Sequence, residues 1–160
     1  MPTAFPLTIT MPTDREIVLT RLFDAPPAFV YEALTSPALL RRWYSPTGWT
    51  LETCEVDLRE GGAWHFRMRK PNGKTVGQRG VYRELVPAAR IVNTETWDDW
   101  DAGETIVTTT LAEEQGRTRY TSTMLFPSQE VRDVVFKNGL ESSAGDLYER
   151  LSDLLRHSNA

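Results

Sequence analysis

The sequence predicts an α+β fold in which a curved antiparallel sheet wraps around one long C-terminal helix. Strand-like segments with period-two alternation follow one another between residues 49 and 126, and short turn signals separate them. The chain then ends in a pattern with apolar residues three and four apart, over residues 127–156. A meander with one apolar face must cover that face, and only this terminal helix is long enough to do so. A central cavity between sheet and helix is expected from this shape.

The chain before the meander divides into an irregular segment, one strand and two short helices. Residues 1–14 are rich in Pro and Thr and are expected to be irregular, although residues 7–9 could add an edge strand. A single domain is expected over residues 15–157. Residues 16–23 (EIVLTRLF) have the composition of a strand, and residues 28–34 and 38–44 those of short helices with proline in or near the first turn.

The strongest strand signal lies at residues 64–69. Trp64, Phe66 and Met68 alternate there with His65, Arg67 and Arg69, so three apolar side chains share one face. Asn72-Gly73 favours a tight hairpin, because both residues tolerate positive φ. The remaining strands are expected at residues 49–58, 75–86, 90–97, 105–111 and 118–126, with the acidic residues 98–104 as a loop.

The terminal helix is expected from Pro127-Ser128 to about Arg156, with a kink or interruption at Asn138-Gly139. Glu130 and Asp133 lie near its start and Arg156 lies near its end, as the helix dipole favours.

Composition excludes several classes of protein. The formal net charge is −4 and the isoelectric point about 5.3, which argues against nucleic-acid binding, since that needs a basic face. Cys54 is the single cysteine, so a disulfide scaffold is excluded, and it is expected to be a small buried hydrophobe. No apolar run approaches the roughly 20 residues that a membrane helix needs. Residues 1–12 do not resemble a signal peptide, and a cytoplasmic location is expected.

Chemistry-bearing motifs are few. The spacing of His, Cys and acidic residues matches no zinc site, and neither a nucleophile elbow nor a phosphate-binding loop occurs. We therefore assign no catalytic residue, no metal ligand and no cofactor. His65 is expected to face outward. The charged residues in the outward phase are expected to form ion pairs across strands: Glu55, Asp57, Arg59, Arg67, Arg69, Arg79 and Arg83.

Aromatic and sulfur-containing side chains in the inward phase are candidates for the wall of a ligand cavity. The predicted lining residues are Trp43, Trp64, Phe66, Met68, Tyr82, Trp97, Tyr120, Met124, Phe136 and Ala144. The competing interpretation is that these residues belong to the ordinary hydrophobic core and line no ligand cavity. Glu95 shares the phase of Trp97, and if it points inward it is the best acid/base candidate, because burial raises the pKa of a carboxyl group.

Residues 97–101 (WDDWD) place two indoles among three carboxylates. One interpretation is the mouth of a pocket or a partner-binding patch, since tryptophan is enriched in binding hot spots. A second is a cationic ligand held by indoles and carboxylates. The third is a solvated loop whose tryptophans lie on the sheet.

Several motifs in this order resemble the activator-of-heat-shock-protein-90-ATPase-like family, within the START-like (SRPBCC) superfamily. They are Arg21-Leu22-Phe23-Asp24-Ala25-Pro26, Ser36-Pro37 with Arg42-Trp43, Glu55-Val56-Asp57-Leu58-Arg59, Gly61-Gly62-Ala63-Trp64-His65-Phe66, Gly80-Val81-Tyr82-Arg83-Glu84 with Pro87, Gly116-Arg117-Thr118-Arg119, and the leucine repeat from Leu147 to Leu155. The resemblance covers roughly residues 15–157 and implies a helix-grip fold. Members of the superfamily bind lipids, sterols, polyketides and plant phenolics, and some are cyclases or hydrolases.

The chain departs from these relatives at two places. Many relatives carry two tryptophans where this chain has Trp43-Tyr44, and relatives often carry Gly-Trp where it has Ser143-Ala144. Without an indole at position 144, a larger cavity is expected if Ala144 faces the sheet.

Three functions are consistent with the sequence. The favoured one is a non-catalytic binder of a small apolar or aromatic molecule. The second is a cyclase- or hydratase-type enzyme that uses buried groups such as Glu95 with Tyr82. The third is a chaperone-linked interaction module, which predicts an exposed patch and little cavity. A C2 homodimer is the expected assembly if the chain self-associates.

Overall fold

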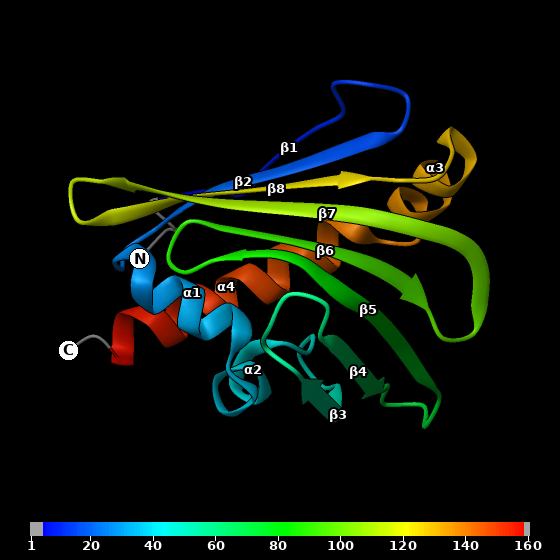
Figure 1. The fold of residues 1–160 in the computed structure, drawn as a ribbon. Helices are drawn as coiled ribbons and strands as arrows, with labels where there is room; N and C mark the ends of the chain where they lie inside the picture. Colours follow the sequence, from blue (N-terminus) through cyan, green and yellow to red (C-terminus); the bar gives the residue numbers. More distant parts are fainter. Residues whose placement is uncertain (1–4, 159–160) are drawn as a thin grey trace.

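The computed structural model describes residues 5–158, which form one eight-stranded antiparallel sheet with helices packed on one face (Figure 1). The strand order is β1-β2-β8-β7-β6-β5-β4-β3. The strands are β1 (Thr8–Thr10), β2 (Glu16–Phe23), β3 (Thr50–Val56), β4 (Ala63–Arg69), β5 (Thr75–Val86), β6 (Arg90–Trp97), β7 (Trp100–Glu114) and β8 (Arg117–Leu125). The helices are α1 (Pro27–Thr35), α2 (Pro37–Trp43), α3 (Gln129–Lys137) and α4 (Leu140–Ser158).

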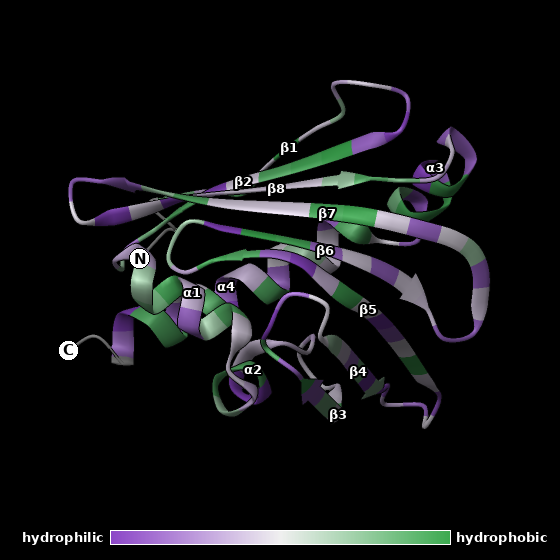
Figure 2. Cartoon of the chain, in the orientation of Figure 1, coloured by the Kyte–Doolittle hydropathy of each residue, from purple (hydrophilic) through white to green (hydrophobic). Residues whose placement is uncertain are grey.

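The sheet has an apolar inner face and a polar outer face, because its strands alternate as the sequence predicts. Figure 2 shows this alternation as green and purple bands along the strands. Helix α4 lies along the inner face, and its leucines Leu151, Leu154 and Leu155 are buried against the sheet. The predicted α+β helix-grip fold is therefore confirmed.

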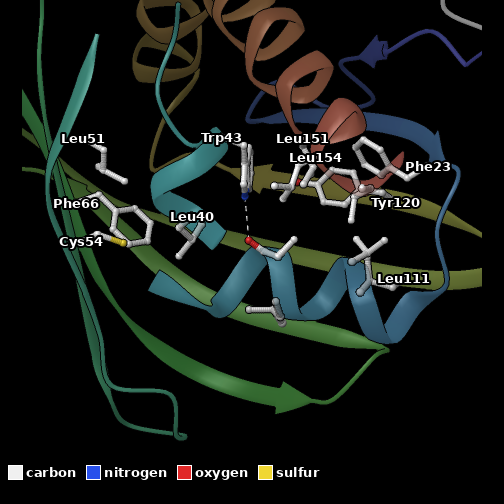
Figure 3. Packing of buried hydrophobic residues seen from close by; sticks show 14 of the residues in the cluster. Phe23, Leu40, Trp43, Leu51, Cys54, Phe66, Leu111, Tyr120, Leu151 and Leu154 are labelled. Atoms are coloured by element: carbon white, nitrogen blue, oxygen red, sulfur yellow. Dashed lines mark hydrogen bonds between the residues drawn. The ribbon is translucent and has the colours of Figure 1, made fainter. Parts of the chain in front are cut away.

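Trp43, at the end of α2, joins the two short helices to the core. Its indole Nε1 donates a hydrogen bond to the carbonyl oxygen of Ala33 in α1 at 2.9 Å. In Figure 3 the ring stands between Leu40 and Phe66 on one side and Tyr120 and Leu151 on the other. A buried indole needs a partner for its N–H, and this bond both satisfies it and fixes the angle between α1 and α2.

The C-terminal pattern over residues 127–156 forms two helices, α3 and α4, rather than one continuous helix. The break falls at Asn138-Gly139, where an interruption was considered, and Gly139 adopts a φ of 95°. Glycine takes this left-handed conformation at no steric cost, which ends α3 and redirects the chain into α4. The remaining helix of 19 residues is about 28 Å long.

The acidic segment is also not the loop that the sequence predicts. Strand β7 begins at Trp100, and Trp97 pairs directly with Trp100, so Asp98 and Asp99 form a two-residue turn. The predicted irregular N-terminal segment contains a short edge strand, in which Thr8–Thr10 pair with Val18–Thr20. Residues 1–4 lie outside the described part of the chain.

The outer face carries ion pairs across strands, but Arg67 and Arg79 pair with Asp98 rather than with Glu55 or Asp57 as expected. The Asp98 carboxylate lies 2.8 Å from His65 Nε2, 2.5 Å from Arg67 Nη1 and 2.9 Å from Arg79 Nε. Burial alone would raise the pKa of Asp98, but hydrogen bonds from His65 and Arg67 and the charge of Arg79 outweigh it and hold this pKa below its usual value.

The other arginines of the outer face find partners that the sequence did not indicate. Arg69 pairs with Glu52, and Arg83 pairs with Glu104. Asp57 and Arg59 pair with each other, and Glu55 lies near His65. None of the described helices is both long and apolar enough to cross a lipid bilayer.

Candidate functional site

A cavity of about 490 Å³ lies between the inner face of the sheet and the helices. Strands β2 and β4 to β8 supply one wall, and the helices α1 to α4 and the segment after α2 supply the other. Cavities of this size are typical of sites for small organic molecules.

The residues predicted to line the cavity do so, with one exception. Trp43, Trp64, Phe66, Met68, Tyr82, Trp97, Tyr120, Met124 and Ala144 all contribute to its wall. Phe136 does not. It packs with Ile17, Leu19 and Phe126 in a second apolar cluster, because α3 is a separate helix whose Val135 faces the cavity instead.

The cavity reaches the surface between the β6–β7 hairpin and the α3–α4 junction. Two residues of its lining, Trp100 and Asn138, are themselves exposed. The rings of Trp97 and Trp100 lie 6.3 Å apart, so the hairpin holds an indole pair at the mouth. Of the three interpretations of residues 97–101, the pocket mouth fits this placement best. Asp98 points to the outer face instead, where it pairs with three basic groups.

A row of polar side chains crosses the inner face of four adjacent strands, and sequence reasoning largely missed it. Its members are Gln78 on β5, Asn93 and Glu95 on β6, Thr109 on β7 and Ser122 on β8, and all of them line the cavity. Thr109 and Ser122 face each other in register. The sequence could have indicated this row, because its members lie in the inward phase of their strands. Polar residues at such positions form either a structural hydrogen-bond network or a binding site.

Glu95 points inward, which is the orientation that makes it the best acid/base candidate of the sequence. Its Oε1 accepts a hydrogen bond from Gln78 Nε2 at 3.2 Å, and Gln78 Oε1 accepts one from the Tyr44 hydroxyl at 3.2 Å. The part of Glu95 that remains accessible faces the cavity rather than bulk water. Burial raises the pKa of Glu95 to about 7, because the charged form loses hydration.

Three tyrosines surround the carboxyl group of Glu95. Its charge acts on Tyr44, Tyr120 and Tyr148, and burial raises the pKa of each of these phenols above the ordinary value. The hydroxyls of Tyr120 and Tyr148 are 2.7 Å apart and share a hydrogen bond between β8 and α4. Burial also raises the pKa of Tyr82, but the groups that act on it are Tyr31 and Cys54. Tyr82 lines the same cavity as Glu95, and within residues 5–158 no hydrogen bond joins the two side chains.

One contact ties the segment after α2 to α4 beside the cavity. The Asp146 carboxylate accepts hydrogen bonds from the backbone N–H of Thr47 at 2.7 Å and from its hydroxyl at 3.0 Å. Pro46 and Trp49 flank this contact and line the cavity. Lys70 also belongs to the lining, with its ammonium 5.3 Å from the centre of the Trp49 ring.

The described residues 5–158 contain no cluster of His, Cys, Asp or Glu that could hold a metal ion. Cys54 is buried in the core, as predicted, and burial raises the pKa of its thiol. The chemistry that the cavity offers is thus a carboxyl group, phenols, amides and hydroxyls within aromatic walls.

Comparison with known proteins decides the family. Residues 24–156 match the family model described as "Activator of Hsp90 ATPase homolog 1-like protein". The chain belongs to this family. No protein of curated function matches it.

Solved structures of similar bacterial proteins share the fold. A protein from Rhodobacter sphaeroides is 29% identical, with a TM-score of 0.89 over 95% of this chain and 99% of that one. A protein from Chromobacterium violaceum is 27% identical, with a TM-score of 0.73 over 89% and 98% of the two chains. A protein from Mycobacterium smegmatis, 21% identical with a TM-score of 0.86 over 94% and 97%, supports the fold alone.

Proposed function

We propose that this member of the family is a non-catalytic binder of a small apolar or aromatic molecule, held between the sheet and α4. The observation that carries this proposal is the cavity of about 490 Å³ with aromatic rings and methionine in its wall. Burial of a ligand against such a wall is favourable by about 25 cal/mol for each Å² of apolar surface removed from water. The indole pair at the mouth adds flat surfaces on which an aromatic ligand can lie.

The test is a thermal-shift screen against fatty acids, sterols, flavonoids and small polyketides. A ligand whose free concentration is a hundred times its Kd stabilises the native state by about 2.7 kcal/mol, which raises Tm by several degrees. We expect one chemical class to produce such a shift. If neither these four classes nor small aromatic alcohols and amines change Tm, the proposal is contradicted.

A variant of Ala144 connects any shift to the cavity. Ala144 is buried in α4 and lines the cavity, so Ala144→Trp places an indole inside it and should abolish the shift. Asp153→Trp adds the same side chain at an exposed position of α4 outside the lining and should keep the shift. Circular dichroism of both variants checks that the fold is intact.

Glu95 supports a second candidate, a cyclase- or hydratase-type enzyme acting on a polyketide-like or aromatic substrate. A buried carboxyl group with a pKa of about 7 can donate and accept a proton near neutral pH. Mass spectrometry of each ligand after incubation distinguishes this candidate from simple binding, since turnover should depend on Glu95 and be lost in Glu95→Gln.

The family name supports a third candidate, a chaperone-linked module that activates the ATPase of heat-shock protein 90. This function needs an exposed docking surface, whereas the cavity favours a small ligand. Measurement of that ATPase with and without the protein tests it directly.

A further inference from the structure

Glu95 lies at the polar end of the cavity, and its surroundings indicate what a ligand must carry. Ile91, Asn93, Glu95 and Trp97 of strand β6 all line the cavity, so the carboxyl group is held in the wall by the strand. On β4, which is separated from β6 by β5, Trp64, Phe66 and Met68 form an apolar wall. A ligand in this cavity therefore meets a carboxyl group among aromatic rings.

The protein satisfies only part of the hydrogen-bonding capacity of this carboxyl group. Gln78 donates to Oε1, and within residues 5–158 no hydrogen bond reaches Oε2. The Gln78 amide is itself oriented by the Tyr44 hydroxyl, so Glu95 is held from one side and its other oxygen is left for a further donor. A carboxylate has room for about four hydrogen bonds.

The charge of Glu95 also has no counter-ion within residues 5–158. Among the described residues, no Lys, Arg or His forms an ion pair with it. Lys70 is the one basic side chain of the lining, and its ammonium lies over the Trp49 ring. An ionised carboxyl group in a desolvated site is costly unless a cation is supplied, and here that cation can come from a ligand.

The chemical groups that a ligand could present differ in how well they meet this need. A hydroxyl group offers a neutral hydrogen bond and leaves the charge of Glu95 uncompensated. A carboxylate would be repelled. A protonated amine offers a charge-assisted hydrogen bond and an opposite charge, and the aromatic rings around Glu95 favour a cation as well.

We propose that the ligand of this cavity is a small aromatic or apolar amine, whose ammonium group lies against the Glu95 carboxylate and whose apolar body lies along the β4 wall. This inference rests on the proposed binding function and specifies the ligand class for the same cavity. Gln78 and Tyr44 act as positioning residues in it, because the Tyr44 hydroxyl donates to Gln78 and the Gln78 amide donates to the carboxylate.

The test compares three compounds that share one skeleton and differ in the end group: phenylbutylamine, phenylbutanol and phenylbutyrate. Binding is followed by calorimetry and by the fluorescence of the cavity tryptophans at about pH 8, where a carboxyl group with a pKa near 7 is ionised. We expect the amine to bind at least about tenfold more tightly than the alcohol, and the acid to bind most weakly.

Two variants locate the origin of this preference. Glu95→Gln keeps the shape of the side chain and removes its charge, so the amine should lose its advantage over the alcohol. Glu113→Gln makes the same change at an exposed site on β7 outside the cavity lining and should leave the advantage intact. A preference for the amine that survives in Glu95→Gln overturns the proposal.

The unmodified protein supplies a second measurement that needs no variant. Between about pH 8 and pH 5.5 the phenols that face Glu95, those of Tyr44, Tyr120 and Tyr148, stay neutral because burial raises their pKa values. The ratio of amine to alcohol affinity should therefore fall as Glu95 takes up a proton. If all three compounds bind equally, the cavity binds ligands but does not select amines. If none binds, the proposed function fails together with this inference.

Discussion

The backbone N–H of Asp98 donates a hydrogen bond to the carbonyl oxygen of Gly77 at 2.9 Å, and the Asp98 carboxylate occupies the space that a side chain at position 77 would need. The turn that carries Trp97 and Trp100 to the mouth of the cavity is thereby fastened to β5 from the outer face of the sheet. Gly77 on β5 and the Asp98 carboxylate in the β6–β7 turn thus help to determine the position of the Trp97–Trp100 pair on the inner side of the sheet.

Gly77→Ala should displace the Asp98 carboxylate, because the new Cβ would overlap it and Arg67. We expect a loss of about 1–3 kcal/mol in the free energy of unfolding, typical of overpacking, and a change in the fluorescence of the Trp97–Trp100 pair. Gly145→Ala is the matched control: no heavy atom lies within 4 Å of a Cβ there, so in the interior of α4 it should stabilise by about 0.5–1 kcal/mol. Denaturant unfolding measures both. Equal effects of the two substitutions would contradict this account.

Asp98→Asn should destabilise the protein by about 1–3 kcal/mol near neutral pH, since it removes the charge that His65, Arg67 and Arg79 share. The pKa of Asp98 in the folded protein lies below its ordinary value of 3.8. The stabilisation is therefore present above about pH 4 and is lost as the pH falls through the folded pKa. The unfolding free energies of the two proteins should converge on acidification. A difference that stays constant with pH would show that the charge of Asp98 is not responsible.

Glu95→Gln should have the opposite effect on stability. The pKa of Glu95 rises from 4.5 to about 7 on folding, so the folded protein binds a proton that the unfolded chain releases. The cost of ionising Glu95 is absent below about pH 4.5, grows as the pH rises, and is complete above about pH 7. At about pH 8 the variant should be more stable than the unmodified protein by up to about 3 kcal/mol. The unfolding free energies of the two proteins should become equal near pH 4.5. If the variant is less stable than the unmodified protein at pH 8, the prediction is wrong.

Asp146→Ala should loosen the segment between α2 and β3. The Thr47 N–H loses its acceptor, and Pro46 and Trp49 at the cavity wall lose the contact that holds them to α4. We expect the Thr47 amide to exchange its hydrogen at least about tenfold faster. Glu141→Ala, an exposed acidic residue in the first turn of the same helix, should leave that rate unchanged. Unchanged exchange at Thr47 in Asp146→Ala would show that the segment is held by other contacts.

Strand and helix positions were predictable from local patterns, because each pattern depends on residues adjacent in sequence. The alternation of Trp64, Phe66 and Met68 determines which side of β4 is buried, whatever lies opposite. The same reasoning placed most of the cavity lining. It failed at Phe136, because the direction in which a residue of α3 points depends on the break at Gly139.

The segment Asp98–Glu104 shows a second limit of local reasoning. Its carboxylates indicate a solvated loop when read alone, yet β7 starts at Trp100. Asp98 is stable in a buried position because His65, Arg67 and Arg79 come from two other strands. Ion pairs between strands form only when the register of the sheet is set, and that register depends on pairing between segments that are distant in the sequence.

What the sequence by itself determined is the family, the fold class and the apolar faces of the strands, since these follow from motifs and periodicity along the chain. Only the tertiary structure decided that Glu95 on β6 shares a cavity with Tyr44 after α2, Tyr120 on β8 and Tyr148 on α4. The physical reason is that the environment of a carboxyl group is set by every group packed around it. The raised pKa of Glu95 and its place among aromatic rings, on which its proposed role rests, exist only in the folded chain.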